Sequence, residues 1–194
     1  MPHTFSQPDI ADYLLRFIAQ QDFATAKHSL NVKMIAVQFA RNLDCSSQFI
    51  QNLSTAALLH DIGKMIIPKN VLHKPGRLTE AEFEIMKEHS QNGFNFLRSI
   101  TQLNHIAEAV LYHHEQYNGQ GYPKGKAGKD IPLMSRILTI VDVYEAITAD
   151  RVYRKAMTPE EAIKVLHDGR GIQFDPKLVT VFLQNIYRFD LKQE

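Results

Sequence analysis

The chain has 194 residues, of which 44% are hydrophobic, and it carries 22 basic and 21 acidic side chains. This length and apolar fraction suit one globular domain with a substantial core, and the near-neutral charge argues against nucleic acid or a membrane as the main partner. The single cysteine, Cys45, excludes an internal disulfide, and neither a signal peptide nor an apolar run approaching ~20 residues is evident, so we expect a cytoplasmic protein.

Helical periodicity dominates the chain and predicts an all-α fold. The first third is expected to form three helices, over residues 9–20, 25–43 and about 46–62. Thr79 and Glu82 then form a capping box ahead of a helix that we expect to bend near Gly93. The next helix is expected over residues 104–115, ending with a histidine doublet.

Residues 116–132 change character, with four glycines and two prolines that predict a loop, in which a short hairpin could form. Residues 133–150 are apolar on nearly every side, which is typical of a central buried helix. The last two helices are expected to start at Thr158-Pro159 and Asp175-Pro176, where a capping residue precedes a proline. The chain therefore predicts a single-domain helical bundle.

Imidazoles and carboxylates interrupt sequence that otherwise suggests buried core. The pair His60-Asp61 follows an apolar helix, the doublet His113-His114 precedes the loop, and Asp142 lies within an apolar run. An unpaired buried carboxylate costs several kcal/mol unless a cation or hydrogen-bond donors satisfy it. We therefore predict a divalent metal site, with His28 and His89 as candidate further ligands.

Two adjacent ions explain the doublets better than one ion does, because neighbouring residues on a helix diverge by about 100°. Asp61 could bridge the ions through its two oxygens. Mixed nitrogen and oxygen ligands favour iron, with manganese, zinc, nickel or magnesium as alternatives, over a thiolate zinc site. Two ions ~3.5–4 Å apart would hold a hydroxide between them and clamp the oxygens of a phosphodiester. Lys64 would add charge at the phosphate or orient the nucleophile.

Other residues extend this site toward a nucleotide phosphate. Arg151 and Arg154 follow the central helix, and arginine matches phosphate through its planar fork. Tyr122 offers a ring on which a base could stack, a contact of about 1–3 kcal/mol. The alternative for His28 or His89 alone is an ordinary core or surface histidine, so the prediction rests on the joint occurrence and most of all on Asp142.

The motifs resemble those of the HD-GYP domain, a branch of the HD metal-dependent phosphohydrolases. The resemblance is carried by Leu59-His60-Asp61-Ile62-Gly63-Lys64, by Asp142-Val143-Tyr144, and by the segment His113-His114-Glu115-Gln116-Tyr117-Asn118-Gly119-Gln120-Gly121-Tyr122-Pro123. It covers residues 22–183, so residues 1–21 are expected to form an N-terminal helical extension and residues 22–194 the domain itself.

The resemblance implies a helical bundle around a di- or trinuclear metal site, often containing iron. It also implies a bacterial phosphodiesterase that opens cyclic di-GMP to linear pGpG, with GMP as a possible further product. The implied metal ligands are His28, His60, Asp61, His89, His113, His114 and Asp142. Lys64 would assist phosphate or water, Gly121, Tyr122 and Pro123 would shape the substrate pocket, and Arg151 and Arg154 would lie near the phosphate and guanine ends.

The sequence departs from the family pattern at several outer positions. Members with a third metal carry a glutamate where this chain has Ala24, so we predict two metals. Asp22, two positions earlier, is retained and is expected to act as a base behind the ligands. The remaining departures are Asn31, Glu145 and Asn118.

Two other functions stay open. One is a catalytically weak module that binds cyclic di-GMP or docks a diguanylate cyclase (GGDEF) protein through Gly121-Tyr122-Pro123. The other is a hydrolase for a different cyclic dinucleotide. The ~20 residues before the domain are shorter than a sensory domain, so control is expected from a separate partner, unless the chain is an excised fragment.

Overall fold

The computed structural model describes residues 6–150 and 155–186, and within these ranges the chain is helical without a β-strand. The α-helices are α1 (Gln7–Gln21), α2 (Phe23–Asn42), α3 (Ser47–Leu59), α4 (Lys69–Leu72), α5 (Glu80–Arg98), α6 (Ala107–Leu111), α7 (Leu133–Thr148), α8 (Pro159–Asp168) and α9 (Pro176–Gln184). The 3₁₀ helices are η1 (Ile62–Ile66), η2 (Asn104–Ile106) and η3 (Gly128–Asp130). The predicted all-α class is confirmed.

The predicted capping residues define the starts of three helices. Thr79 caps α5 and Thr158 caps α8, and each forms a reciprocal capping box with the glutamate three positions later. Asp175 caps α9 by accepting from the backbone N–H groups of Lys177 and Leu178. Local sequence thus sets where these helices begin.

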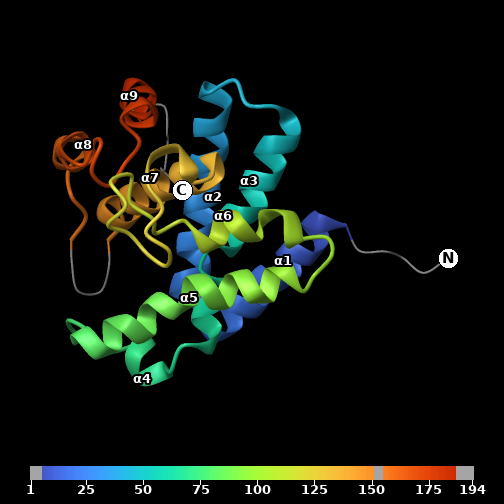
Figure 1. Ribbon diagram of the computed structural model, residues 1–194. Helices are drawn as coiled ribbons and strands as arrows, with labels where there is room; N and C mark the ends of the chain where they lie inside the picture. Colours follow the sequence, from blue (N-terminus) through green and yellow to red (C-terminus); the bar gives the residue numbers. More distant parts are fainter. Residues whose placement is uncertain (1–5, 151–154, 187–194) are drawn as a thin grey trace.

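The core is built around α2, which packs against α1, α3 and α7, while α8 and α9 lie beside α7 (Figure 1). α7 is the central buried helix that the sequence predicts, and its Ile137, Leu138 and Ile140 are fully buried. α1 adds Leu14 and Ile18 to the same hydrophobic core. Among the described helices, none has both the length and the apolar character required to cross a membrane.

Two helices end earlier than the periodicity predicts. The third ends at Leu59, after which the chain turns through His60 and Asp61 into η1. The helix expected over residues 104–115 consists of η2 and α6 and stops at Leu111, so the histidine doublet follows it. Apolar spacing of three residues persists through a 3₁₀ turn, and periodicity therefore cannot separate such turns from α-helix.

Two glycines bring η1 and α5 into direct main-chain contact. A β-carbon at Gly63 would lie 2.0 Å from the carbonyl oxygen of His89 and 2.6 Å from the nitrogen of Gly93. α5 runs as one continuous helix through Gly93, where a bend was expected.

The short hairpin that could form in residues 116–132 is reduced to a single bridge between Asn118 and Ala127.

Candidate metal centre

Seven polar side chains from five segments meet in the interior. They come from α2 (His28), the end of α3 (His60, Asp61), α5 (His89), the turn after α6 (His113, His114) and α7 (Asp142). Six of them form two groups, in each of which one ligand atom per residue lies within 4.8 Å of the others. We call His28, His60 and Asp142 the carboxylate triad, and His89, His113 and His114 the imidazole triad.

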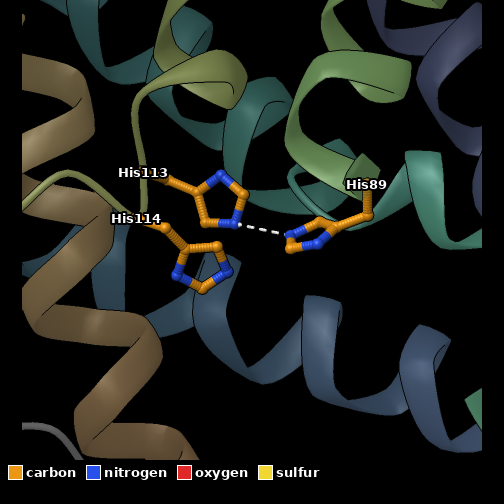
Figure 2. Close-up of side chains that lie close together, drawn as sticks. All are labelled: His89, His113 and His114. Carbon is orange, nitrogen blue, oxygen red and sulfur yellow. Dashed lines mark hydrogen bonds between the residues drawn. The ribbon is translucent and has the colours of Figure 1, made fainter. Parts of the chain in front are cut away.

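In the imidazole triad, a ring nitrogen of His89 faces a ring nitrogen of His113 (Figure 2). Nδ1 of His89 lies 2.7 Å from the carbonyl oxygen of Met86, and Nδ1 of His113 lies 2.5 Å from that of Val110. A carbonyl only accepts hydrogen bonds, so the proton of each ring is on Nδ1 and the lone pair is on Nε2. The two Nε2 atoms are 3.3 Å apart.

Burial keeps these rings neutral. It lowers the pKa of His89 and of His113, and it acts with the neighbouring His89 to lower the pKa of His114 to about 3. Two neutral rings whose protons are on Nδ1 have no hydrogen to place between their Nε2 atoms. A shared cation would turn this contact into an attraction, since two nitrogens ~2.1 Å from one ion are about 3–3.4 Å apart.

The carboxylate triad carries more charge. Nε2 of His28 lies 2.9 Å from Asp142, and its Nδ1 contacts Glu145. Burial by itself would lower the pKa of His28, but the hydrogen bonds to Asp142 and Glu145 and the nearby negative charges outweigh it and raise the pKa to about 9. Burial likewise opposes ionisation of Asp142, yet His28 holds its pKa well below the usual range.

His60 supplies an orphaned nitrogen in this triad. Its Nδ1 donates to the carbonyl oxygen of Ala57 at 2.8 Å, which leaves the lone pair on Nε2. That buried Nε2 has no hydrogen-bond partner in the described residues, and it faces Asp61 at 3.4 Å and Asp142 at 3.8 Å. A lone pair directed at two carboxylates is repelled by them, and a cation between them would turn the contact into an attraction.

Asp61 lies between the two triads. Its Oδ2 is 3.4 Å from His60, whereas its Oδ1 is 3.6 Å from Nε2 of His89. Lys64 donates to Oδ2 at 2.6 Å. Burial opposes ionisation of Asp61, but Lys64 and the surrounding imidazoles hold its pKa well below the usual range. One carboxylate oxygen therefore faces each triad, as a bridging ligand requires.

This set of donors fits divalent metal. A cation would satisfy the orphaned His60 nitrogen and the facing nitrogens of His89 and His113. Nitrogen and oxygen donors without a thiolate suit iron, manganese or a similar ion. The residues present can therefore hold metal.

The loop after the doublet folds back over the imidazole triad. A β-carbon at Gly121 would lie 2.2 Å from the nitrogen of Gln116 and 2.5 Å from the carbonyl oxygen of His114, so only glycine permits this approach. The N–H of Tyr122 donates to that carbonyl at 3.2 Å, and the Tyr122 ring lies 4.9 Å from the His114 ring at 33°. Pro123 follows through a cis peptide bond.

Three further residues were predicted for the site, namely Asp22, Arg151 and Arg154. Asp22 caps α2 by accepting from the N–H groups of Ala24 and Thr25 and from the Thr25 hydroxyl. These bonds give its carboxylate a structural task at the helix start, and Asp22 belongs to neither triad. Arg151 and Arg154 lie outside the described residues.

Sequence reasoning overlooked the part played by Glu145. This buried carboxylate contacts Nδ1 of His28 and accepts from Nδ2 of Asn31 at 2.8 Å. Carboxylates that hold the distal nitrogen of a ligand histidine orient the ring and increase its basicity. The available signal was an acidic residue one helical turn after Asp142 in an apolar helix. Thr139 was also overlooked, and its hydroxyl donates to the carbonyl oxygen of His113 at 2.8 Å.

Most of the chain is similar to known proteins. A family model described as HD domain matches residues 12–178. The chain is 38% identical to a cyclic di-GMP phosphodiesterase of Pseudomonas aeruginosa, over 85% of this chain and 40% of that protein. It is 36% identical to a 3'3'-cGAMP-specific phosphodiesterase of Vibrio cholerae, over 83% of this chain and 31% of that protein.

The fold also has a solved counterpart. A structure described as an HDG"Y"P protein from Bdellovibrio bacteriovorus superposes with a TM-score of 0.69 at 19% identity, covering 93% of this chain and 62% of the other. The chain spans less than half the length of the curated relatives that it matches.

Proposed function

Because the chain belongs to the HD domain family, we propose that it is a metal-dependent phosphodiesterase that hydrolyses cyclic di-GMP to linear pGpG, with GMP as a further product. The observation that carries this proposal is the pair of triads joined by Asp61, in which buried nitrogen lone pairs face one another and face carboxylates. The name of the Pseudomonas aeruginosa relative supports the substrate.

In this proposal the two triads hold two divalent ions, for which iron is favoured and manganese is the first alternative. When bound, such ions lower the pKa of water and neutralise charge on phosphoryl oxygens. Ala24 lies one helical turn before His28 and has no donor for a third ion, in keeping with a count of two.

The protein's own residues then have distinct tasks. Asp61 presents one oxygen to each triad and sets their relative position. The Lys64 ammonium neutralises Asp61 and can turn toward a phosphate at the partly exposed side of the centre. Arg151 and Arg154 remain proposed phosphate and guanine contacts, and Asp22 remains a proposed base behind the ligands in addition to its capping role.

A different cyclic dinucleotide is the second candidate substrate. The relative named for 3'3'-cGAMP is about as similar to this chain as the relative named for cyclic di-GMP. Both candidates share the phosphodiester and at least one guanine, so they use the same metal centre and differ only in base recognition.

The proposal also includes location and partners. The single cysteine suits a reducing compartment, and we place the protein in the cytoplasm. Docking of a GGDEF protein through Gly121, Tyr122 and Pro123 is less favoured than contact with substrate, because this segment is folded onto His114.

The test is turnover by anaerobically purified protein reloaded with iron or with manganese. We expect conversion of cyclic di-GMP to pGpG, followed by chromatography, with 3'3'-cGAMP as a competing substrate in the same vessel. Chelated protein is the control and should be inactive until metal is returned. Tight binding of cyclic di-GMP without product in both metal forms would contradict the enzyme and favour a sensor.

A further inference from the structure

An aromatic and cationic cluster lies on α5 beside the loop that covers the metal centre. Phe83 is 44% exposed, and its ring meets that of Tyr122 edge to face with 6.4 Å between centroids. The Lys87 ammonium lies 4.9 Å from the centroid of Phe83 and 5.6 Å from that of Tyr122. Three side chains from two distant segments thus share one surface position.

This cluster is connected to the imidazole triad by ring contacts. Tyr122 packs on His114, and Phe83 packs on Tyr122. Phe83 is therefore two ring contacts from a metal-ligating position, at the end that is open to solvent. A molecule whose phosphate lies at the metal centre could extend along this row of rings.

Local helix stability does not account for the cluster. Phe83 and Lys87 are four residues apart on α5, and a pair at this spacing can stabilise a helix without contact to any other segment. Tyr122, however, comes from the loop and packs against both of them, and its ring also packs on that of His114. The arrangement joins α5 to the loop at the edge of the site.

We propose that Phe83, Lys87 and Tyr122 form a subsite for one nucleobase of the cyclic dinucleotide. The purine would stack on the exposed Phe83 ring, with the Lys87 ammonium beside its carbonyl or an adjacent phosphate oxygen. Aromatic side chains bind bases through their π-faces, and an ammonium is a strong donor to such oxygens. This inference rests on the proposed function and adds binding residues that the motifs do not include.

The experiment compares Phe83→Ala and Lys87→Gln with matched controls. Phe96→Ala removes a similarly exposed phenyl ring (39%) from the other end of α5, and Lys164→Gln removes an exposed lysine from α8. For Phe83→Ala we expect KM for cyclic di-GMP to rise about tenfold with little change in kcat, and for Lys87→Gln a smaller rise. Metal content should stay at the wild-type level in all four variants.

A nucleobase-free diester, methyl p-nitrophenyl phosphate, separates base recognition from chemistry. Its kinetics should be unaffected by Phe83→Ala. An equal loss on both substrates, or a loss of metal, would show that Phe83 only supports α5 and would overturn the subsite. An unchanged KM for cyclic di-GMP in Phe83→Ala would overturn it as well.

Binding distinguishes failure of the subsite from failure of the proposed function. A non-hydrolysable phosphorothioate analogue of cyclic di-GMP should bind about tenfold more weakly to Phe83→Ala than to Phe96→Ala. If the wild type binds the analogue but never turns over cyclic di-GMP, the proposed enzyme is wrong, and this ratio still decides the subsite. Absence of wild-type binding to the analogue would overturn the subsite.

Discussion

The two halves of the metal centre use the same way of fixing an imidazole but differ in charge. His60 in the carboxylate triad and His89 and His113 in the imidazole triad each donate Nδ1–H to the carbonyl three residues earlier. In the carboxylate triad, however, His28 lies between Asp142 and Glu145, and its pKa is raised to about 9. The imidazole triad has no carboxylate of its own, and burial lowers the pKa of all three rings.

This difference determines what each half must do to accept an ion. Ligands bind metal in their deprotonated form, so protons on them compete with metal. The imidazole triad is already neutral near pH 7, whereas His28 carries a proton that must leave. We expect the imidazole triad to load first and the carboxylate triad to load with proton release.

The largest effect is expected where the two halves meet. Asp61→Asn removes the charge that both ions would share, so it should lower metal affinity by more than the roughly 10–100-fold typical of outer contacts and should abolish turnover. Metal analysis and circular dichroism measure this, and the helical signal should be retained. Asp12→Asn is the control, because Asp12 is exposed on α1 and belongs to neither triad. Two ions retained by Asp61→Asn would exclude its bridging role.

The independence of the halves is tested by removing one ligand from each. His28→Ala and His114→Ala should each lower the metal content from two ions per chain to one, and activity should fall at least about a hundredfold because both ions serve the reaction. Anomalous scattering from crystals of each variant would show which position stays filled. Loss of both ions from either single variant would mean that the centre fills as one unit.

Glu145→Gln tests the support behind the carboxylate triad. Loss of its charge should weaken metal binding there by about 10–100-fold and leave the imidazole triad unchanged, because Glu145 contacts Nδ1 of His28, which belongs to the carboxylate triad. Manganese titration calorimetry should then show one weakened and one unaltered step. Glu160→Gln, an exposed change on α8, is the matched control. Equal weakening of both steps would assign Glu145 to overall stability instead.

The smallest effect expected is on the stability of the metal-free protein with pH. The pKa of His28 is above its ordinary value of 6.5, so its stabilisation is complete below about pH 6.5 and is lost as pH rises through about 9. The pKa of His114 is lowered to about 3, so the unfolded chain binds its proton more readily and stability falls as pH drops from about 6.5 toward 3.

Urea unfolding with chelator present measures this dependence. Stability should be greatest near pH 6.5, and His28→Gln should remove the decline on the alkaline side while leaving the acidic one. An alkaline decline that persists in His28→Gln would assign it to another group.

Sequence reasoning succeeded where the signal is local. Capping residues such as Thr79 and Thr158 mark helix starts because they act on the next three N–H groups. Helix ends were misplaced at His60 and at the doublet, since 3₁₀ turns keep the apolar spacing. The seven polar residues of the centre were predicted from polar groups set in apolar sequence and then from the family resemblance, and the structure brings them together.

Pairings between distant segments could not be predicted. Asn31 and Glu145 were noted as separate departures from the family pattern, yet they bond to each other across α2 and α7. Phe83 gave no signal, because an exposed phenylalanine on a helix acquires its meaning only when Tyr122 packs on it. The capping role of Asp22 was not predicted, and its role as a base stays a prediction.

The contact between Gly63 and α5 has a mechanical consequence. The main chains of η1 and α5 touch there, with no side chain between them to compress or rearrange. The distance between His89 and the His60–Asp61 pair is thus fixed by van der Waals contact between the two main chains. Any β-carbon at position 63 would push α5 outward and move His89 away from Asp61. The spacing of the metal-binding side chains therefore depends on a residue that has no side chain of its own.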